Sequence, residues 1–208
     1  SHSILIVDMS GSMRRDDVNG ARCRSDGVWM TLARDYIQGP LLAGQRSNTD
    51  LVSVVVMRET PEVVLSCEPT DWFLYNKFLE MREWDTIRPC GHGNYMPAID
   101  TAEALLMLNA TGSCALSVLF FSDGKPSDGH LDHQSRLGEL ASKFGRRLSI
   151  TCIGMADTDE DFSVLKNMAE EAKTFGAVAS FEKPSLCAES LGSAVSSLAT
   201  SLTSSMSD

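Results

Sequence analysis

The sequence predicts an α/β fold: a doubly wound, mostly parallel sheet of six strands, with one antiparallel edge strand and helices on both faces. Two nearly continuous apolar runs, at 51–57 and 115–122, are typical of strands that are covered on both faces. Segments with apolar residues at helical spacing lie between the strand-like segments. After a single hairpin this alternation is strict, and a strand that follows a helix usually pairs in parallel with the strand before it.

Glycine, proline and the apolar periodicity give the order of the elements. The expected strands are at 3–7, 51–57, 62–68, 115–122, 148–153 and 176–181, and the expected helices lie around 29–37, 71–84, 97–109, 137–144, 162–172 and 191–202. Asp26 is the predicted N-cap of the first helix, and Gly39 and Pro40 are predicted to end it. The segment 62–68 is the predicted antiparallel edge strand.

Composition limits both the organisation and the partners. The 208 residues, 43% of them hydrophobic, suit a single domain over 1–208, with a core at about 3–202 and a serine-rich tail. The net charge of −10 argues against nucleic acid and anionic membranes as partners. No apolar run approaches the roughly 18 residues of a membrane helix. Six cysteines without a C-x-x-C pair favour a reducing, intracellular (cytoplasmic) location, while an extracellular one stays open.

Polar clusters follow two of the expected strands. Asp8-Met9-Ser10-Gly11-Ser12 follows the first strand, and Asp123-Gly124-Lys125-Pro126 follows the strand at 115–122. In a doubly wound sheet these two strands are neighbours, and ligand sites form outside the carboxyl ends of the strands. Two carboxylates that meet there repel each other unless a positive charge lies between them. We therefore expect a divalent cation at this edge.

The donor types indicate which metal would bind. Asp and Ser side chains offer hard oxygen atoms, and no thiolate is required. A small set of oxygen donors with few carboxylates suits Mg²⁺, with Mn²⁺ or Ca²⁺ as possible substitutes. Four or five protein oxygens leave one position of a magnesium octahedron open for a ligand from outside the chain.

Asp8-Met9-Ser10-Gly11-Ser12 resembles the D-x-S-x-S motif of the metal-ion-dependent adhesion site of von Willebrand factor type A domains. The Asp123-Gly124-Lys125-Pro126 segment resembles the D-G-x-P element of the same family, and the order and number of elements over residues 3 to 202 are also similar. The resemblance implies that Asp8, Ser10, Ser12 and Asp123 bind the metal, some of them through water. It also implies a Rossmann-like, non-catalytic module for adhesion, in which an Asp or Glu of a protein partner completes the metal shell.

Two features depart from the family pattern. The family has a threonine in the loop before the third helix, and here that position falls on Gly93, or on Asn94 if the loop is shifted by one. Asn94 is the candidate substitute ligand, because its amide oxygen is also a hard donor. The first loop carries about a dozen additional polar residues at 14–26, which either contact a partner or form a solvated loop.

Two other functions remain open at the level of the sequence. One is a metal-independent interaction domain of the same fold with a degenerate site. The other is a metal-dependent phosphohydrolase with Asp8 as nucleophile, although Ser10 stands where such enzymes usually have a second carboxylate. The nucleophile-elbow and P-loop motifs are absent, which argues against catalysis. The group formed by His130, Asp132 and His133 is interpreted as a solvated first helical turn rather than a metal site.

Overall fold

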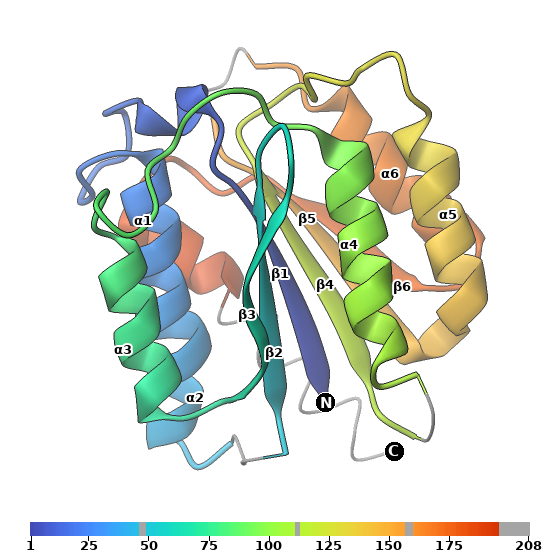
Figure 1. The fold of residues 1–208 in the computed structure, drawn as a ribbon, viewed down its shortest axis with the longest axis horizontal. Helices are drawn as coiled ribbons and strands as arrows, with labels where there is room; N and C mark the ends of the chain where they lie inside the picture. The colour runs from blue at the N-terminus through green and yellow to red at the C-terminus, as the bar shows by residue number, and fades with distance from the viewer. Residues whose placement is uncertain (46–48, 111–112, 157–159, 196–208) are drawn as a thin grey trace.

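The computed structural model describes residues 1–45, 49–110, 113–156 and 160–195. Its six strands form one sheet in the order β3-β2-β1-β4-β5-β6, with helices on both faces (Figure 1). The strands are β1 (His2–Asp8), β2 (Leu51–Met57), β3 (Glu62–Pro69), β4 (Leu116–Ser122), β5 (Leu148–Gly154) and β6 (Val178–Glu182). The helices are α1 (Arg24–Thr31), α2 (Gly39–Leu42), α3 (Trp72–Met81), α4 (Tyr95–Met107), α5 (His133–Phe144) and α6 (Ser163–Thr174). The predicted fold class is confirmed.

The two faces of the sheet support separate cores because strand side chains alternate between faces. Along β1, Ile4 and Ile6 join the core under α4, α5 and α6, whereas Leu5 and Val7 join the core under α1 and α3. All four side chains are fully buried. Burial on both faces explains why the central strands appear as continuous apolar runs in the sequence.

Strand pairing follows the predicted pattern. β2 and β3 pair in antiparallel fashion, and all other neighbouring strands pair in parallel. In the register of β1 with β4, Val7 lies opposite Phe121, so both strands end at the same edge of the sheet. This register brings the polar segments that start at Asp8 and Ser122 together.

The predicted ends of the first helix were wrong. The N-cap of α1 is Cys23, and Asp26 lies in the first turn, where its buried carboxylate accepts a hydrogen bond from the Arg22 backbone N–H at 2.9 Å. Gly39 and Pro40 do not end the helical segment. The chain widens into a π-helix (Leu32–Gln38) and continues as α2, with Pro40 in its first turn. A proline is accommodated there because the π-helix shifts the regular i→i−4 hydrogen bonds of the backbone just before it, with the Gly39 N–H donating to Arg34 O.

Residues 188–195 begin the predicted C-terminal helix, and Leu191 and Val195 pack into the core beside α1. The remainder of that helix and the serine-rich tail lie outside the described residues. Within the described ranges, no helix has the length and apolar character of a membrane span.

Candidate metal site at the carboxyl ends of β1 and β4

Four of the five predicted ligands converge above the carboxyl ends of β1 and β4. Ser10 Oγ lies 3.0 Å from Ser12 Oγ, and Ser12 Oγ donates a hydrogen bond to Asp123 Oδ1 at 3.0 Å. The backbone N–H of Ser10 donates to Asp8 Oδ1 at 2.8 Å. These hydrogen bonds connect the four side chains across two separate loops.

The spacing of these oxygens suits a small octahedral cation. With ligands at about 2.0–2.1 Å from Mg²⁺, neighbouring oxygens of the octahedron lie about 2.9 Å apart. The distances from Ser12 Oγ to Ser10 Oγ and to Asp123 Oδ1 are both 3.0 Å. Elsewhere in the described ranges, as here, no three or more His, Cys, Asp or Glu side chains are grouped so that they could hold a metal ion. A metal at this site would therefore depend on the serine hydroxyls as well as on Asp8 and Asp123.

Asp8 is held in a buried and electrostatically unfavourable position. The residue is 3% exposed, and burial, together with the charge of Asp123, raises the pKa of the Asp8 carboxyl to about 6. Ser122 Oγ donates to Asp8 Oδ2 at 2.7 Å, and the Tyr95 hydroxyl lies 2.7 Å from Ser122 Oγ. A buried carboxylate with a raised pKa lacks sufficient positive charge around it, and a divalent cation would supply that charge.

The structure distinguishes between Gly93 and Asn94 as the position that corresponds to the missing threonine. A Cβ built on Gly93 would lie 3.2 Å from Asp8 Oδ1 and 3.4 Å from Ser10 Cβ, so this position faces the site. The side chain of Asn94 instead donates to the backbone carbonyl of Glu59 at 3.2 Å, in the turn between β2 and β3. The structure therefore does not bring the Asn94 amide together with the other four candidates.

A buried arginine that was not anticipated from the sequence also reaches the site. Arg24, at the start of α1, is 1% exposed, and its Nη1 donates to Asp123 Oδ2 at 2.9 Å. Its Nε donates to Asp17 Oδ1 at 2.9 Å. Burial alone would lower the pKa of the Arg24 guanidinium, but the hydrogen bonds and charges of Asp17 and Asp123 raise it. Arg24 therefore supplies a permanent positive charge beside Asp123.

Asp128 holds the third loop in place beside the other two. Its carboxylate accepts hydrogen bonds from the Tyr95 N–H at 3.0 Å and the Met96 N–H at 2.9 Å, at the N-terminus of α4. His133 Nε2 lies 3.0 Å from the same carboxylate, and both residues are buried. The interpretation of His133 as part of a solvated turn was therefore wrong. Asp128 follows Asp123 by five residues, and only its contacts, not its spacing, reveal its role.

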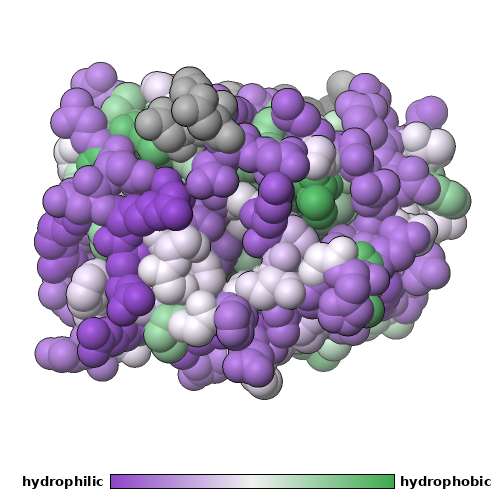
Figure 2. Space-filling model, turned by 90° about the horizontal axis from the view of Figure 1, so that it is seen from above, coloured by the Kyte–Doolittle hydropathy of each residue, from purple (hydrophilic) through white to green (hydrophobic). Residues whose placement is uncertain are grey.

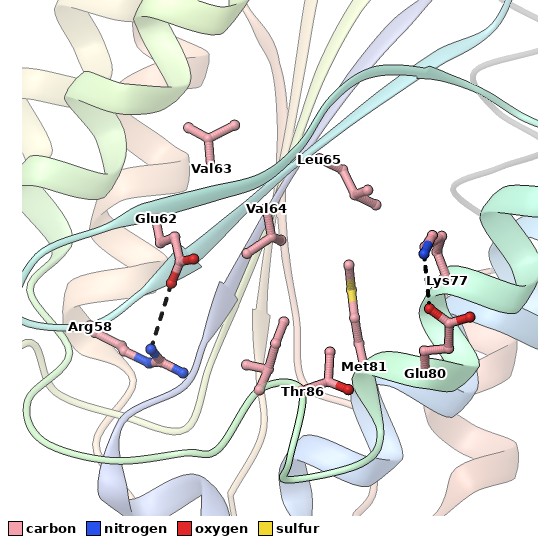
Figure 3. A pocket seen from close by; sticks show the side chains of 10 residues that line it. Arg58, Glu62, Val63, Val64, Leu65, Lys77, Glu80, Met81 and Thr86 are labelled. Carbon is pink, nitrogen blue, oxygen red and sulfur yellow. Dashed lines mark hydrogen bonds and ion pairs between the residues drawn. The ribbon is translucent and has the colours of Figure 1, made fainter.

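The face that carries the site is polar. Viewed from above, it is mostly hydrophilic, with pale, near-neutral residues in the middle and only small green areas (Figure 2). A separate hollow of about 420 Å³ lies between β3 and α3 (Figure 3). Its four charged side chains form two ion pairs, Arg58 with Glu62 at 3.7 Å and Lys77 with Glu80 at 3.0 Å. The charges of that hollow are thus matched internally, whereas Asp8 at the sheet edge has no ion pair within the described residues.

Comparison with known proteins identifies the family. The sequence profile of the von Willebrand factor type A domain matches residues 3–125, which include both aspartates of the site. The chain belongs to the von Willebrand factor type A family. Domains of this family (VWA domains) are generally non-catalytic modules that bind other proteins. No curated protein sequence matches the chain significantly.

Solved structures share the fold of this VWA domain at low sequence identity. The PilB minor pilin from Streptococcus sanguinis superposes with a TM-score of 0.73 at 13% identity, over 98% of this chain and 61% of the pilin. BatB from Bacteroides thetaiotaomicron gives 0.65 at 17% identity, over 97% of this chain and 98% of that protein. The SpRpn10 VWA domain gives 0.61 at 17% identity, over 94% and 93% of the two chains. The chain thus spans less than two thirds of the pilin, and these likenesses establish the fold alone.

Proposed function

We propose that this VWA domain binds Mg²⁺ through Asp8, Ser10, Ser12 and Asp123 and captures an Asp or Glu side chain of a protein partner on the open side of the metal. The observation that carries the proposal is the convergence of two buried carboxylates and two hydroxyls from separate loops: Ser12 Oγ lies 3.0 Å from both Ser10 Oγ and Asp123 Oδ1, and Asp8 Oδ1 accepts from the Ser10 N–H. A chain with a net charge of −10 repels acidic groups in general. A bound divalent cation would reverse that repulsion locally and give an acidic side chain a specific place to bind.

Magnesium binding can be measured on the protein alone. We expect chelator-treated protein to bind one Mg²⁺ in isothermal titration calorimetry and to unfold at a higher temperature in millimolar Mg²⁺, because a ligand of the folded state stabilises it. Mn²⁺ should act similarly, and Ca²⁺ should bind more weakly because it prefers six to eight oxygens. EDTA should reverse the effect. A protein that shows no saturable binding and no shift in millimolar Mg²⁺ would contradict the proposal.

The partner class needs a separate experiment. Peptides selected from a random phage library in Mg²⁺ should contain an Asp or Glu that is essential for binding. Replacing that residue with Asn or Gln, or adding EDTA, should remove the interaction. Selected peptides that bind equally well in EDTA would instead support the second candidate function, a metal-independent interaction domain.

The second candidate has its own structural support. Arg24 already pairs with Asp123, and Gly93 supplies no hydroxyl beside Asp8. Both features reduce the attraction of the site for a cation relative to a site with a threonine and without the arginine. The Mg²⁺ proposal remains the stronger of the two because Asp8 has no cationic partner among the hydrogen bonds recorded for it in the described residues.

A gain of affinity would test whether Gly93 occupies the position of the missing ligand. Replacing Gly93 with Thr is expected to strengthen Mg²⁺ binding, because its hydroxyl would enter the site beside Asp8; a gain of about 1 kcal/mol corresponds to roughly a fivefold lower Kd. Calorimetric titration measures the change. Gly93→Ala is the matched control, because it adds the same Cβ, 3.2 Å from Asp8 Oδ1, without an oxygen. Equal affinities for the Thr and Ala variants would refute this assignment.

A further inference from the structure

The buried ion pairs of Arg24 connect the metal site to the long first loop. Arg24 is contributed by the first turn of α1, and its guanidinium lies between two carboxylates, Asp123 in the site and Asp17 in the loop. The side chain of Arg24 is 2% exposed and that of Asp17 is 33% exposed. Asp123 in the site and Asp17 in the loop therefore compete for the one buried guanidinium of Arg24.

We propose that Arg24 is a built-in counter-cation of the site that weakens its affinity for a divalent metal ion, and that Asp17 limits this effect by sharing the guanidinium. The inference rests on the proposed function, because it concerns the affinity of that same site. It assigns Arg24 and Asp17 as residues that set affinity without binding the metal.

The electrostatic reason lies in how Asp123 uses its two oxygens. Oδ1 accepts from Ser12 and belongs to the set of metal donors, while Oδ2 accepts from Arg24. A cation bound at Oδ1 would lie within a few ångströms of the guanidinium, and in a buried setting like charges at that distance repel strongly. Because the guanidinium cannot lose its proton at ordinary pH, this repulsion is permanent.

Asp17 acts in the opposite direction. Its carboxylate accepts from Arg24 Nε and Nη2 and draws part of the positive charge away from Asp123. The hydrogen bonds from Arg24 also hold the pKa of the Asp17 carboxyl below its usual value. Without Asp17, the guanidinium would have Asp123 as its only carboxylate partner among the recorded contacts, and the metal would meet its full charge.

The same arrangement gives the loop before α1 a role beyond connecting β1 to α1. The loop supplies Asp17 to the buried Arg24, which also contacts Asp123 in the site. A partner that contacts Asp17 would change the charge that Arg24 presents to Asp123. The loop is thus a route by which partner binding and metal affinity can influence each other.

Mg²⁺ titration of two single variants tests the proposal, because their expected effects have opposite signs. Arg24→Gln removes the charge and is expected to lower the Kd for Mg²⁺ by about tenfold or more. Asp17→Asn leaves the site and the arginine in place and is expected to raise the Kd by about threefold. In the double variant, Asp17→Asn should have little further effect, because it acts through Arg24.

Asp16→Asn is the matched control for charge. Asp16 is the exposed neighbour of Asp17 and has no recorded contact with Arg24, so its loss should leave the Kd within about twofold of the unmodified value. Thermal unfolding provides a second readout. In EDTA, Arg24→Gln should unfold at a lower temperature than the unmodified protein, and Mg²⁺ should raise the unfolding temperature of Arg24→Gln by more than it raises that of the unmodified protein.

The outcomes separate this inference from the proposed function. If the unmodified protein and all variants bind no Mg²⁺, the proposed function fails and the inference falls with it. If the unmodified protein binds Mg²⁺ but Arg24→Gln binds equally or more weakly, Arg24 positions Asp123 rather than opposing the metal, and only the inference is overturned. If Arg24→Gln does not fold, the comparison of Asp17→Asn with Asp16→Asn decides: equal affinities overturn the inference, and a weaker Asp17→Asn supports it.

Discussion

Replacing Asp128 with alanine is expected to lower the free energy of unfolding by about 2–4 kcal/mol. The buried carboxylate accepts from two backbone N–H groups in the first turn of α4 and contacts His133. Alanine would leave these donors buried without a partner, and each such loss costs about 1–3 kcal/mol. It would also remove a negative charge from the positive end of a 13-residue helix. Urea denaturation at neutral pH measures the change.

Asp132→Ala is the matched control for this substitution. Asp132 is the N-cap of α5, and its carboxylate accepts from the Ser135 N–H at 3.0 Å at an exposed position. Because water can replace this partner, we expect a loss of only about 1 kcal/mol. Equal losses for the two variants would mean that burial of Asp128 adds nothing to an ordinary helix cap, which would contradict its assignment as the residue that holds the loop before α4.

A consequence for the site follows from the position of this loop. Gly93, which faces Asp8, is held by Ser127, whose N–H donates to Gly93 O at 2.9 Å. Asp128 is the next residue and fixes the start of α4. Asp128→Ala should therefore weaken Mg²⁺ binding as well as lower stability, although it alters none of the proposed metal ligands.

The fold and the site differ in how far the sequence predicts them. Alternation of apolar residues determines which face each strand residue buries, so the strand order and the meeting of Asp8 with Asp123 could be predicted from the pattern of elements. The end of the first helix could not, because Pro40 is tolerated once the π-helix has shifted the backbone hydrogen bonds. Glycine and proline in the sequence indicate where a helix could end, but tertiary packing determines whether it does end there.

Arg24 and Ser122, which contact the candidate metal site, were missed for a different reason. Arg24 and Asp123 are 99 residues apart, and the long first loop contains several other arginines and aspartates that could have paired differently. Nothing in the spacing shows that Arg24 is buried while Arg14 and Arg15 are exposed. Ser122 offered a weak signal, because it is a polar residue at the end of a buried strand directly before Asp123. Its bond to Asp8 depends on strand order and register, which only the structure supplies.

Asp8→Asn is expected to have two opposite effects. It should abolish Mg²⁺ binding, because an amide replaces one of the two carboxylates of the site. In EDTA at pH 7.5 it should raise the free energy of unfolding by about 3 kcal/mol, since the pKa of the Asp8 carboxyl is raised from 3.8 to about 6. Burial is the main cause of that raised pKa, and the charge of Asp123 is the second. Calorimetry measures the first effect and urea denaturation the second.

The sign of the pH dependence follows from the same shift. Between pH 3.8 and 6 the folded protein holds a proton on Asp8 that the unfolded chain releases, so protonation favours the folded state in this range. As the pH falls from 7.5 to 4.5, the advantage of Asp8→Asn in EDTA should shrink from about 3 to about 1 kcal/mol. An Asp8→Asn variant that is less stable at pH 7.5 and still binds Mg²⁺ would contradict both expectations.

Mg²⁺ should nearly remove the difference in stability between the unmodified protein and Asp8→Asn. At a concentration of 100 times its Kd, a ligand of the folded state adds about 2.7 kcal/mol, which is similar to what ionised Asp8 costs in the absence of metal. The unmodified protein in Mg²⁺ should therefore unfold at nearly the temperature of Asp8→Asn, and the variant itself should not respond to the metal. The cost of burying the ionised Asp8 carboxylate beside Asp123 would then be the physical source of the proposed metal affinity, because a bound cation would offset a penalty that folding has already imposed.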